Sequence, residues 1–264
     1  MWEIILPIFG LLIGTIASLT GIGGGAIIVP LLTLLYFFEP PNAVGTSLTT
    51  IIFTALAATL NYARQKRIHY KTGLVLATTT IPGAFLGAFL TTVIPPKQLG
   101  LIFGFFLIIV ALRMIMSTRS YEKTETMNDT KQPSGKTENN LPASDKMIVR
   151  GAALSFFGGL ASGLLGIGGG VLIVPIMTFA MSMPIHYATA TSMFTMIFTS
   201  TSGVAQHYLA DHISIEYALP LALGTVLGAQ LGAYTSKKIS SKNLRRVFGI
   251  ALLVVSIQMI IKYL

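Results

Sequence analysis

Gly21-Ile22-Gly23-Gly24-Gly25-Ala26-Ile27-Ile28-Val29-Pro30 returns at residues 166–175 as Gly-Ile-Gly-Gly-Gly-Val-Leu-Ile-Val-Pro, with eight of ten positions identical. The two copies are 145 residues apart. The same offset aligns Thr46-Ser47 with Thr191-Ser192, and it needs no gap over about a hundred residues. A repeat of this length indicates an internal duplication, so the chain consists of two related halves.

The composition is typical of a membrane protein. Hydrophobic residues make up 53% of the 264 residues and charged residues only 10%, whereas soluble domains carry about 25% charged residues. The basic residues behind the net charge of +9 cluster between apolar segments, so we expect topology signals and no nucleic-acid partner. The uncharged stretches predict a multi-pass protein of the plasma membrane, with the lipid bilayer as its partner. These stretches are 4–38, 43–63, 72–96, 151–210 and 217–236.

The charge pattern divides the chain into a first membrane repeat at 1–117, a polar linker at 118–150 and a second membrane repeat at 151–264. Each repeat begins with an apolar region that the glycines interrupt, and Pro30 and Pro175, to which we assign structural roles, interrupt it again. The pieces are short for independent spans. The predicted fold class is all-α integral membrane, in which each repeat has a glycine-broken, re-entrant-like helix pair followed by three transmembrane helices. Whether the pairs are re-entrant or fully spanning stays open. The six following helices are expected at 43–62, 72–93, 99–117, 188–208, 217–235 and 247–263.

The distribution of basic residues predicts that the two repeats are inverted. The loop at 64–71 is basic, whereas its counterpart one repeat later carries Asp211 and Glu216 and no Lys or Arg. The next pair of loops reverses this bias, with only Lys97 in the first half and five basic residues at 237–246 in the second. By the positive-inside rule, the linker faces the cytoplasm and both termini face outside. Inverted repeats around broken helices are common in secondary transporters.

The glycine stretches are the first candidates for a binding site. A glycine turn leaves backbone N–H groups uncovered at the start of the following half-helix, whose dipole attracts an anion. The alternative is that the glycines only permit close helix crossing. The candidate substrate-binding glycines are Gly21, Gly23, Gly24, Gly25, Gly166, Gly168, Gly169 and Gly170.

Duplicated polar residues are further candidates for contacts with the substrate. Thr46, Ser47, Thr191 and Ser192 carry hydroxyls that either donate to an anion or satisfy backbone carbonyls in the helices. Asn61 and Gln206 are equivalent across the repeat and either bridge helices or touch a permeating solute. Both alternatives stay open for each set.

The groups that are missing from the apolar segments also restrict the function. No carboxylate lies inside a predicted span, which argues against a carboxylate proton relay and against cationic substrates. His207 and His212 have no second cluster of ligands beside them in the sequence, so we expect no metal site. We also find no convergent acid, base or nucleophile set, and therefore expect a protein that is not an enzyme and needs no cofactor.

The doubled glycine motif, each copy followed some 15 residues later by Gly45-Thr46-Ser47 or Ala190-Thr191-Ser192, resembles the sulfite exporter TauE/SafE family of membrane permeases. The resemblance covers nearly everything except the linker. It implies a carrier for small sulfur-containing anions such as sulfite, thiosulfate or sulfonates. We expect export by alternating access with the site between the glycine motifs; a passive anion channel on the same scaffold is the alternative. The ion, the direction, the coupling and a homodimer remain open.

Overall fold

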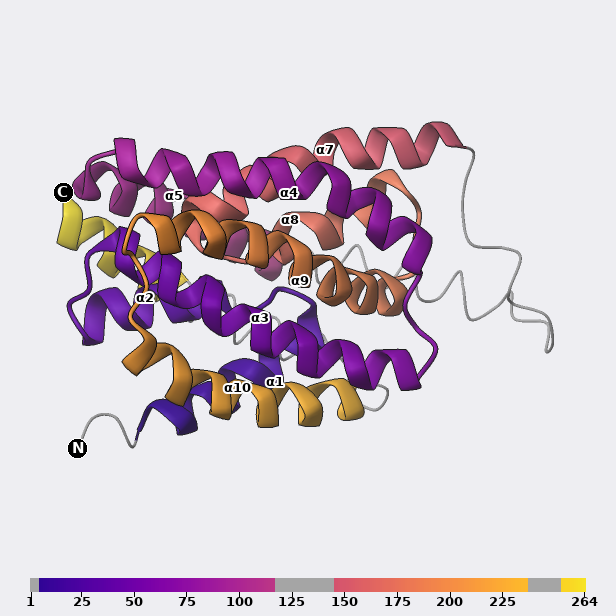
Figure 1. The fold of residues 1–264 in the computed structure, drawn as a ribbon, viewed down its shortest axis with the longest axis horizontal. Coiled ribbons are helices and arrows are strands. Elements are labelled where there is room, and N and C mark those ends of the chain that lie inside the picture. Colours follow the sequence, from indigo (N-terminus) through magenta and orange to yellow (C-terminus); the bar gives the residue numbers. More distant parts are fainter. Residues whose placement is uncertain (1–4, 117–144, 237–252) are drawn as a thin grey trace.

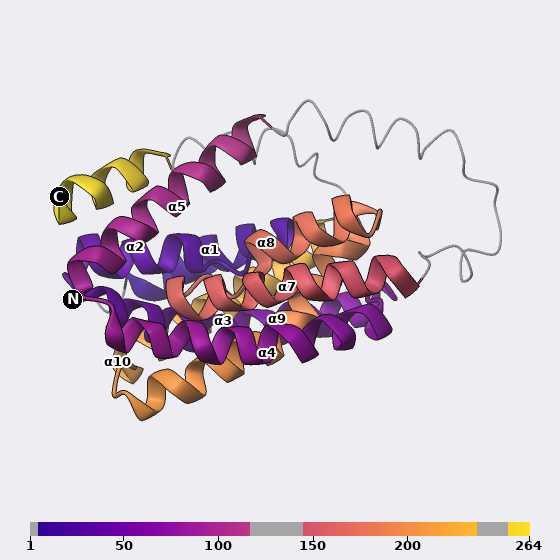
Figure 2. The same ribbon diagram turned by 90° about the horizontal axis from the view of Figure 1, so that it is seen from above.

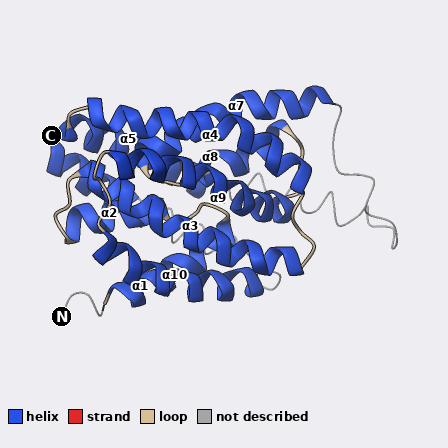
Figure 3. Ribbon diagram, viewed as in Figure 1, coloured by secondary structure: helices blue, strands red, loops and turns tan. Residues whose placement is uncertain are grey.

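The computed structural model describes residues 5–116, 145–236 and 253–264, and within these ranges it contains helices and connecting loops but no strand (Figure 3). A last helix, at 253–263, precedes the C-terminus. The other helices are α1 (Leu6–Thr20), α2 (Gly25–Leu35), α3 (Pro40–Arg64), α4 (Tyr70–Val93), α5 (Pro96–Met116), α7 (Asp145–Leu165), α8 (Gly170–Pro175), the π-helical segment η2 (Ile176–Ala180), α9 (Ile185–Leu209) and α10 (Ile215–Thr235).

The all-helical class expected from the sequence is confirmed for the described residues. Helices α3, α4, α5, α9 and α10 lie where long apolar helices were expected, and their bounds differ from the expected ones by only a few residues. One boundary is different: α7 begins at Asp145, inside the range expected for the linker. The rest of the expected linker, the basic loop of the second half and residues 247–252 lie outside the described residues.

The two halves of the chain interlock. The most extensive helix pairs are α1 with α10 and α4 with α7, so each half places its first helix against a helix of the other half. Figure 1 shows the α4–α7 pair on one side of α9 and α3 and the α1–α10 pair on the other, and Figure 2 shows α7 alongside α4. Glycines bring the backbones close: Gly87 lies against the Leu160 carbonyl of α7, and Gly228 against the Leu11 carbonyl of α1. These small residues therefore serve helix packing.

Equivalent turns of the two halves have the same local structure. The turn after α3 passes through Lys66 with a φ of 54°, and the turn after α9 passes through Asp211 with a φ of 56°. The following residue in each turn, Arg67 or His212, donates its backbone N–H to the carbonyl of Tyr62 or His207. In Figure 1 the two turns lie at opposite ends of the bundle. Residues of these two turns that lie 145 positions apart in the sequence therefore have the same local structure.

The glycine stretches separate α1 from α2 and α7 from α8. Gly24 and Gly169 are the residues before α2 and α8, with φ values of 89° and 84° that an L side chain rarely adopts. Pro30 lies inside α2, where Thr33 Oγ1 donates to the Val29 carbonyl. Pro175 ends α8, and the helix continues as η2. Because proline has no backbone N–H, each helix loses one internal hydrogen bond at this point.

Large apolar side chains cover much of the outer surface. Within the described ranges, two helices, α3 and α4, are long and apolar enough to cross a membrane by length and composition. Outward-facing side chains such as Leu60, Phe105 and Leu223 are more than half exposed. Such a surface is expected where lipid rather than water surrounds the helices.

Candidate functional site

The two glycine stretches meet in the interior of the bundle. They run antiparallel, so that Gly25 packs against the carbonyl of Gly166 and Gly170 packs against the carbonyl of Gly21. All four residues are buried. Of the candidate glycines, Gly21, Gly25, Gly166 and Gly170 meet across the two stretches, and Gly23 lies near the Ile167 carbonyl. Gly24 and Gly169 face residues of their own half, and Gly168 faces Ile51 and Met196. A solute held between the two turns requires that they separate.

The helix starts at these turns carry backbone donors that make no hydrogen bond within their helices. In α2, the first intrahelical bonds run from Ile27 and Ile28 to the Gly24 carbonyl, each at 3.0 Å. In α8, Leu172 and Ile173 bond to the Gly169 carbonyl at 3.0 and 2.9 Å. The two N–H groups before these residues in each helix precede the first helical bond. Each helix start also carries the positive end of the helix dipole.

The duplicated serines tie each turn to the opposite half. Ser47 Oγ donates to the Gly166 carbonyl at 2.8 Å, and Ser192 Oγ donates to the Gly21 carbonyl at 3.1 Å. A hydroxyl has one hydrogen, so neither serine has a donor left for an anion in this conformation. These contacts favour the carbonyl-satisfying role that the sequence left open.

The duplicated threonines bind backbone groups in turns of the opposite half. Thr46 Oγ1 accepts the backbone N–H of Ser214 at 3.1 Å, and Thr191 Oγ1 accepts that of His69 at 3.0 Å. His69 and Ser214 are themselves 145 residues apart. Both pairs therefore form one repeated contact that holds the start of α3 or α9 to the turn before α10 or α4.

Two apolar side chains close the space around the turns. A Cβ built on Gly23 would lie 2.6 Å from the sulfur of Met196, and one built on Gly170 would lie 2.9 Å from its Cε. On the other side, Ile51 lies 2.9 Å from a Cβ built on Gly168. Ile51 and Met196 are equivalent in the repeat, and both are fully buried. Sequence reasoning missed them, because Ile and Met in an apolar helix carry no signal beyond core packing.

One buried hydroxyl beside the second turn has no partner. Ser162 Oγ is buried without a hydrogen bond to any described residue, and Ser162 Cβ lies 3.5 Å from a Cβ built on Gly169. Its counterpart beside the first turn is Ala17, near Gly24. The second turn thus combines helix N–H groups with a free hydroxyl. In the sequence, the sign of this hydroxyl is the difference between Ala17 and Ser162 at equivalent positions of the repeat, which by itself does not indicate a site.

Asn61 and Gln206 have different surroundings despite their equivalence. Asn61 Nδ2 donates to the Gln230 side-chain oxygen at 3.1 Å, and its Oδ1 accepts from Gln65 at 2.9 Å. Gln230 Nε2 in turn donates to the Ala57 carbonyl at 2.7 Å. Asn61 therefore bridges helices α3 and α10. These bonds occupy its amide, which disfavours a substrate contact.

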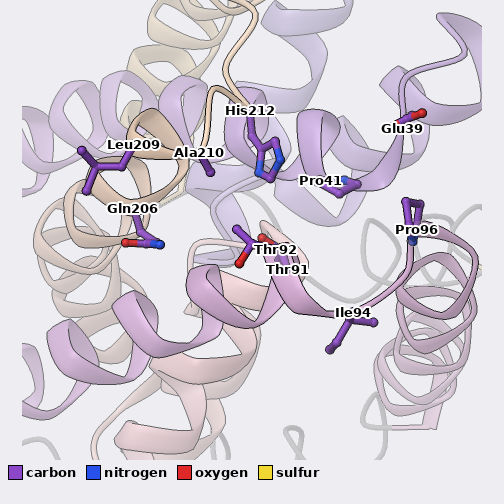
Figure 4. A pocket seen from close by; sticks show the side chains of 10 residues that line it. All are labelled: Glu39, Pro41, Thr91, Thr92, Ile94, Pro96, Gln206, Leu209, Ala210 and His212. Carbon is purple, nitrogen blue, oxygen red and sulfur yellow. The ribbon is translucent and has the colours of Figure 1, made fainter.

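Gln206 lines a cavity of about 510 Å³ at the end of the bundle where α3 begins and α4 and α9 end (Figure 4). The cavity lies beside the start of α3, where Val44 contacts Gly166 of the second turn. Its lining residues are Glu39, Pro41, Thr91, Thr92, Ile94, Pro96, Gln206, Leu209, Ala210 and His212. The start of α3 thus borders the cavity through Pro41 and contacts the second turn through Val44. Among the described residues, no group of three or more His, Cys, Asp or Glu is placed to hold a metal ion.

Comparison with known proteins identifies the family of this chain. The family model described as "Sulfite exporter TauE/SafE" matches residues 6–259. The chain belongs to this family. The resemblance inferred from the glycine motifs is thereby confirmed, and membership of the TauE/SafE family indicates a membrane transporter.

Curated relatives of this TauE/SafE chain carry transporter names. "Probable membrane transporter protein YunE" of Bacillus subtilis is 33% identical and covers 97% of each chain. "Probable membrane transporter protein MJ0441" of Methanocaldococcus jannaschii is 30% identical over 91% of this chain and 89% of its own. A "Probable membrane transporter protein" of Xylella fastidiosa is 29% identical over 95% of this chain and 92% of its own. No solved structure matches significantly. These names support membrane transport of a small substrate and are consistent with a protein that is not an enzyme.

Proposed function

We propose that the protein exports small sulfur-containing anions, such as sulfite, thiosulfate or sulfonates, by alternating access, with the substrate held where the two glycine turns meet. The observation that carries this proposal is the antiparallel contact of the turns, with Gly25 on Gly166 and Gly170 on Gly21. This contact brings together two helix starts whose first N–H groups make no hydrogen bond within their helices. The family name supports the sulfur-anion class.

An anion at this place is stabilised by dipoles rather than by full charges. Each helix start contributes roughly half a positive charge, and at the second turn the unpartnered Ser162 hydroxyl adds a donor. The Gly170 and Val171 N–H groups and the Ser162 hydroxyl form the proposed donor set, with the first turn contributing Gly25 and Ala26. Weak, neutral donors suit a carrier, because the anion must leave again.

Access to the donors requires motion of the turns and of Met196. In this structure the two turns touch, which we call the closed arrangement, and the Met196 side chain covers Gly23 and Gly170. An unbranched methionine side chain changes rotamer easily, which would uncover the donors without distorting the helices. We further propose that the two repeats are inverted in the bilayer, with the linker in the cytoplasm. Opening toward one face would then be matched by closing toward the other.

The test is transport by the purified protein in lipid vesicles. We expect labelled sulfite to cross with saturable kinetics, and excess unlabelled sulfite on the opposite side to accelerate it by counterflow. Thiosulfate and small sulfonates should compete, whereas chloride at the same ionic strength should not. Protein-free vesicles are the control for leakage.

Two results would contradict the proposal in different ways. Flux that rises linearly with concentration and shows no counterflow would indicate a passive channel. Saturable transport of another anion, without competition by any sulfur oxyanion, would leave a carrier but refute the substrate class.

Replacing Ser162 with Ala should raise the half-saturating concentration for sulfite while the melting temperature changes little, because the hydroxyl has no hydrogen-bond partner to lose in the described part of the chain.

A further inference from the structure

Two histidines meet at the wall of the cavity. His207 near the end of α9 is fully buried, and its ring centroid lies 5.7 Å from that of the half-buried His212 in the following turn. The Nδ1 atoms of both rings are buried and have no hydrogen-bond partner in the described part of the chain. His212 also lines the cavity (Figure 4). The pair thus holds two unused nitrogen atoms next to a space that solutes can enter.

The other half of the molecule shows what these positions do without histidine. The equivalent of His207 is Tyr62, whose hydroxyl donates to the Ser18 carbonyl at 2.7 Å. His207 Nε2 makes the same contact with the Gly163 carbonyl at 3.3 Å, and Gly163 is the equivalent of Ser18. Because a carbonyl oxygen only accepts, Nε2 of His207 carries the hydrogen. In a neutral ring, Nδ1 of His207 is then a buried lone pair with nothing to bind.

Burial and two acidic groups act on the pair in opposite directions. Burial lowers the pKa of His212, while the carboxylates of Asp211 in the same turn and Glu39 before α3 act in the opposite direction. The other faces of the cavity contribute no further described titratable group: α4 brings the hydroxyls of Thr91 and Thr92, and α7 brings the Gly163 carbonyl. A second charge would lie next to the first, so the surroundings suit one proton and not two.

We propose that His207 and His212 form a site for one proton, which His212 takes up from the cavity while the neutral His207 ring lies beside it. The proton forms an N–H bond at an Nδ1 lone pair, and the positive charge that results lies beside Glu39 and Asp211. This ligand is separate from the anion of the proposed function, and its binding is measurable without any transport. The charge would also offset the carboxylate of Glu39, which otherwise repels an anion entering the cavity.

The experiment is an NMR titration of the full-length protein in lipid nanodiscs, with ring-¹⁵N histidine, from about pH 5 to pH 9. His207→Tyr copies Tyr62 of the other half and keeps a donor for the Gly163 carbonyl, while His212→Gln tests the pair from the half-buried side. His69→Asn is the matched control. His69 lies in the equivalent loop before α4, but its Nδ1 already accepts the Thr72 N–H at 3.3 Å.

In the unmodified protein we expect the His212 signals to change with pH at one midpoint and the His207 signals to report the same midpoint, because the neutral His207 ring lies beside the charge. His207→Tyr should move the His212 midpoint to lower pH by up to about one unit, because the lone pair of the neutral ring no longer stabilises that charge. His212→Gln should abolish the change of the His207 signal at this midpoint, and His69→Asn should alter neither signal. Independent midpoints, or a His212 midpoint unchanged in His207→Tyr, would overturn the proposal. Either result would leave the anion-transport proposal untouched.

Discussion

The contact between the two glycine turns makes a sharp prediction for Gly25→Ala. Gly25 begins α2 with ordinary helical backbone, so alanine introduces no backbone strain, but its methyl group would collide with the Gly166 carbonyl. The atoms that this methyl group would meet, in Gly166 and Ile167, are backbone atoms. The whole turn must therefore shift. Gly158→Ala is the matched control, because Gly158 is a buried glycine in α7 whose added Cβ would lie 3.6 Å from its nearest neighbours.

The magnitude follows from two opposing terms. Alanine stabilises a helix over glycine by about 1 kcal/mol, and this gain is common to both variants. Overpacking costs about 1–3 kcal/mol, and only Gly25→Ala has this cost. The two variants should therefore differ in the free energy of the closed arrangement by about 1–3 kcal/mol. At about 1.4 kcal/mol per factor of ten, this corresponds to a loss of roughly five- to a hundredfold in the population of the closed arrangement.

Two measurements test this difference. In detergent, Gly25→Ala should melt at a lower temperature than Gly158→Ala, by about 2–4 °C per kcal/mol for a chain of this size. In vesicles, sulfite flux should fall in Gly25→Ala and be retained in Gly158→Ala, if closure of the turns is a step of transport. Gly170→Ala should behave like Gly25→Ala, because its methyl group would meet the Gly21 carbonyl. Equal melting temperatures and equal flux in Gly25→Ala and Gly158→Ala would refute the reasoning.

Four further substitutions have defined outcomes. Ser47→Ala and Ser192→Ala should each lower the stability in unfolding experiments by about 1–3 kcal/mol, because each leaves a buried carbonyl without its donor, and unequal effects on the two turns would contradict the repeated contact. Met196→Leu should cost less than about 1.5 kcal/mol in stability yet slow sulfite flux, since a branched side chain uncovers the turns less easily; unchanged flux would exclude Met196 as a gate. Glu39→Gln removes a carboxylate that raises the pKa of His212, so the His212 midpoint in the NMR titration should move to lower pH, and an upward or absent shift would contradict this electrostatic contribution.

Much of the fold could be predicted from the sequence because local signals determine it. The glycine clusters and the prolines predicted breaks in the apolar region that begins each repeat, and the structure separates α1 from α2 and α7 from α8 at those glycines, whereas Pro30 lies inside α2. The small-residue spacing Gly83-xxx-Gly87 is typical of a close helix contact. This spacing does not identify the partner helix, because any helix can pack closely against a face of small residues. That α7 of the other half fills it depends on how the halves interlock.

The site was predictable in its glycines but not in its surroundings. The glycine turns were expected to approach each other, yet the sequence could not show that they touch or that the serine hydroxyls are used in holding them. Ser162 and Met196 escaped notice because an isolated serine or methionine in an apolar helix is ordinary. Gln206 and Asn61 are equivalent in sequence, but only Asn61 faces a glutamine at position 230, whose own counterpart is Phe85. Their different environments depend on residues far away in the chain.

The differences between the halves carry as much meaning as the repeat. A carrier made of two identical inverted halves would have inward- and outward-facing states of equal energy, because each state would be the mirror of the other in its contacts. Any preference must therefore come from positions where the halves differ. Three such pairs lie beside the second turn or the cavity: Ala17 with Ser162, Ile51 with Met196 and Tyr62 with His207. In each of them the second half holds the more adaptable group: a hydroxyl without a partner among the described residues, a flexible thioether or a titratable ring. Under the proposed function, the second turn and the nearby cavity are therefore where substrate and proton would bias the cycle, while the first half would supply the fixed contacts.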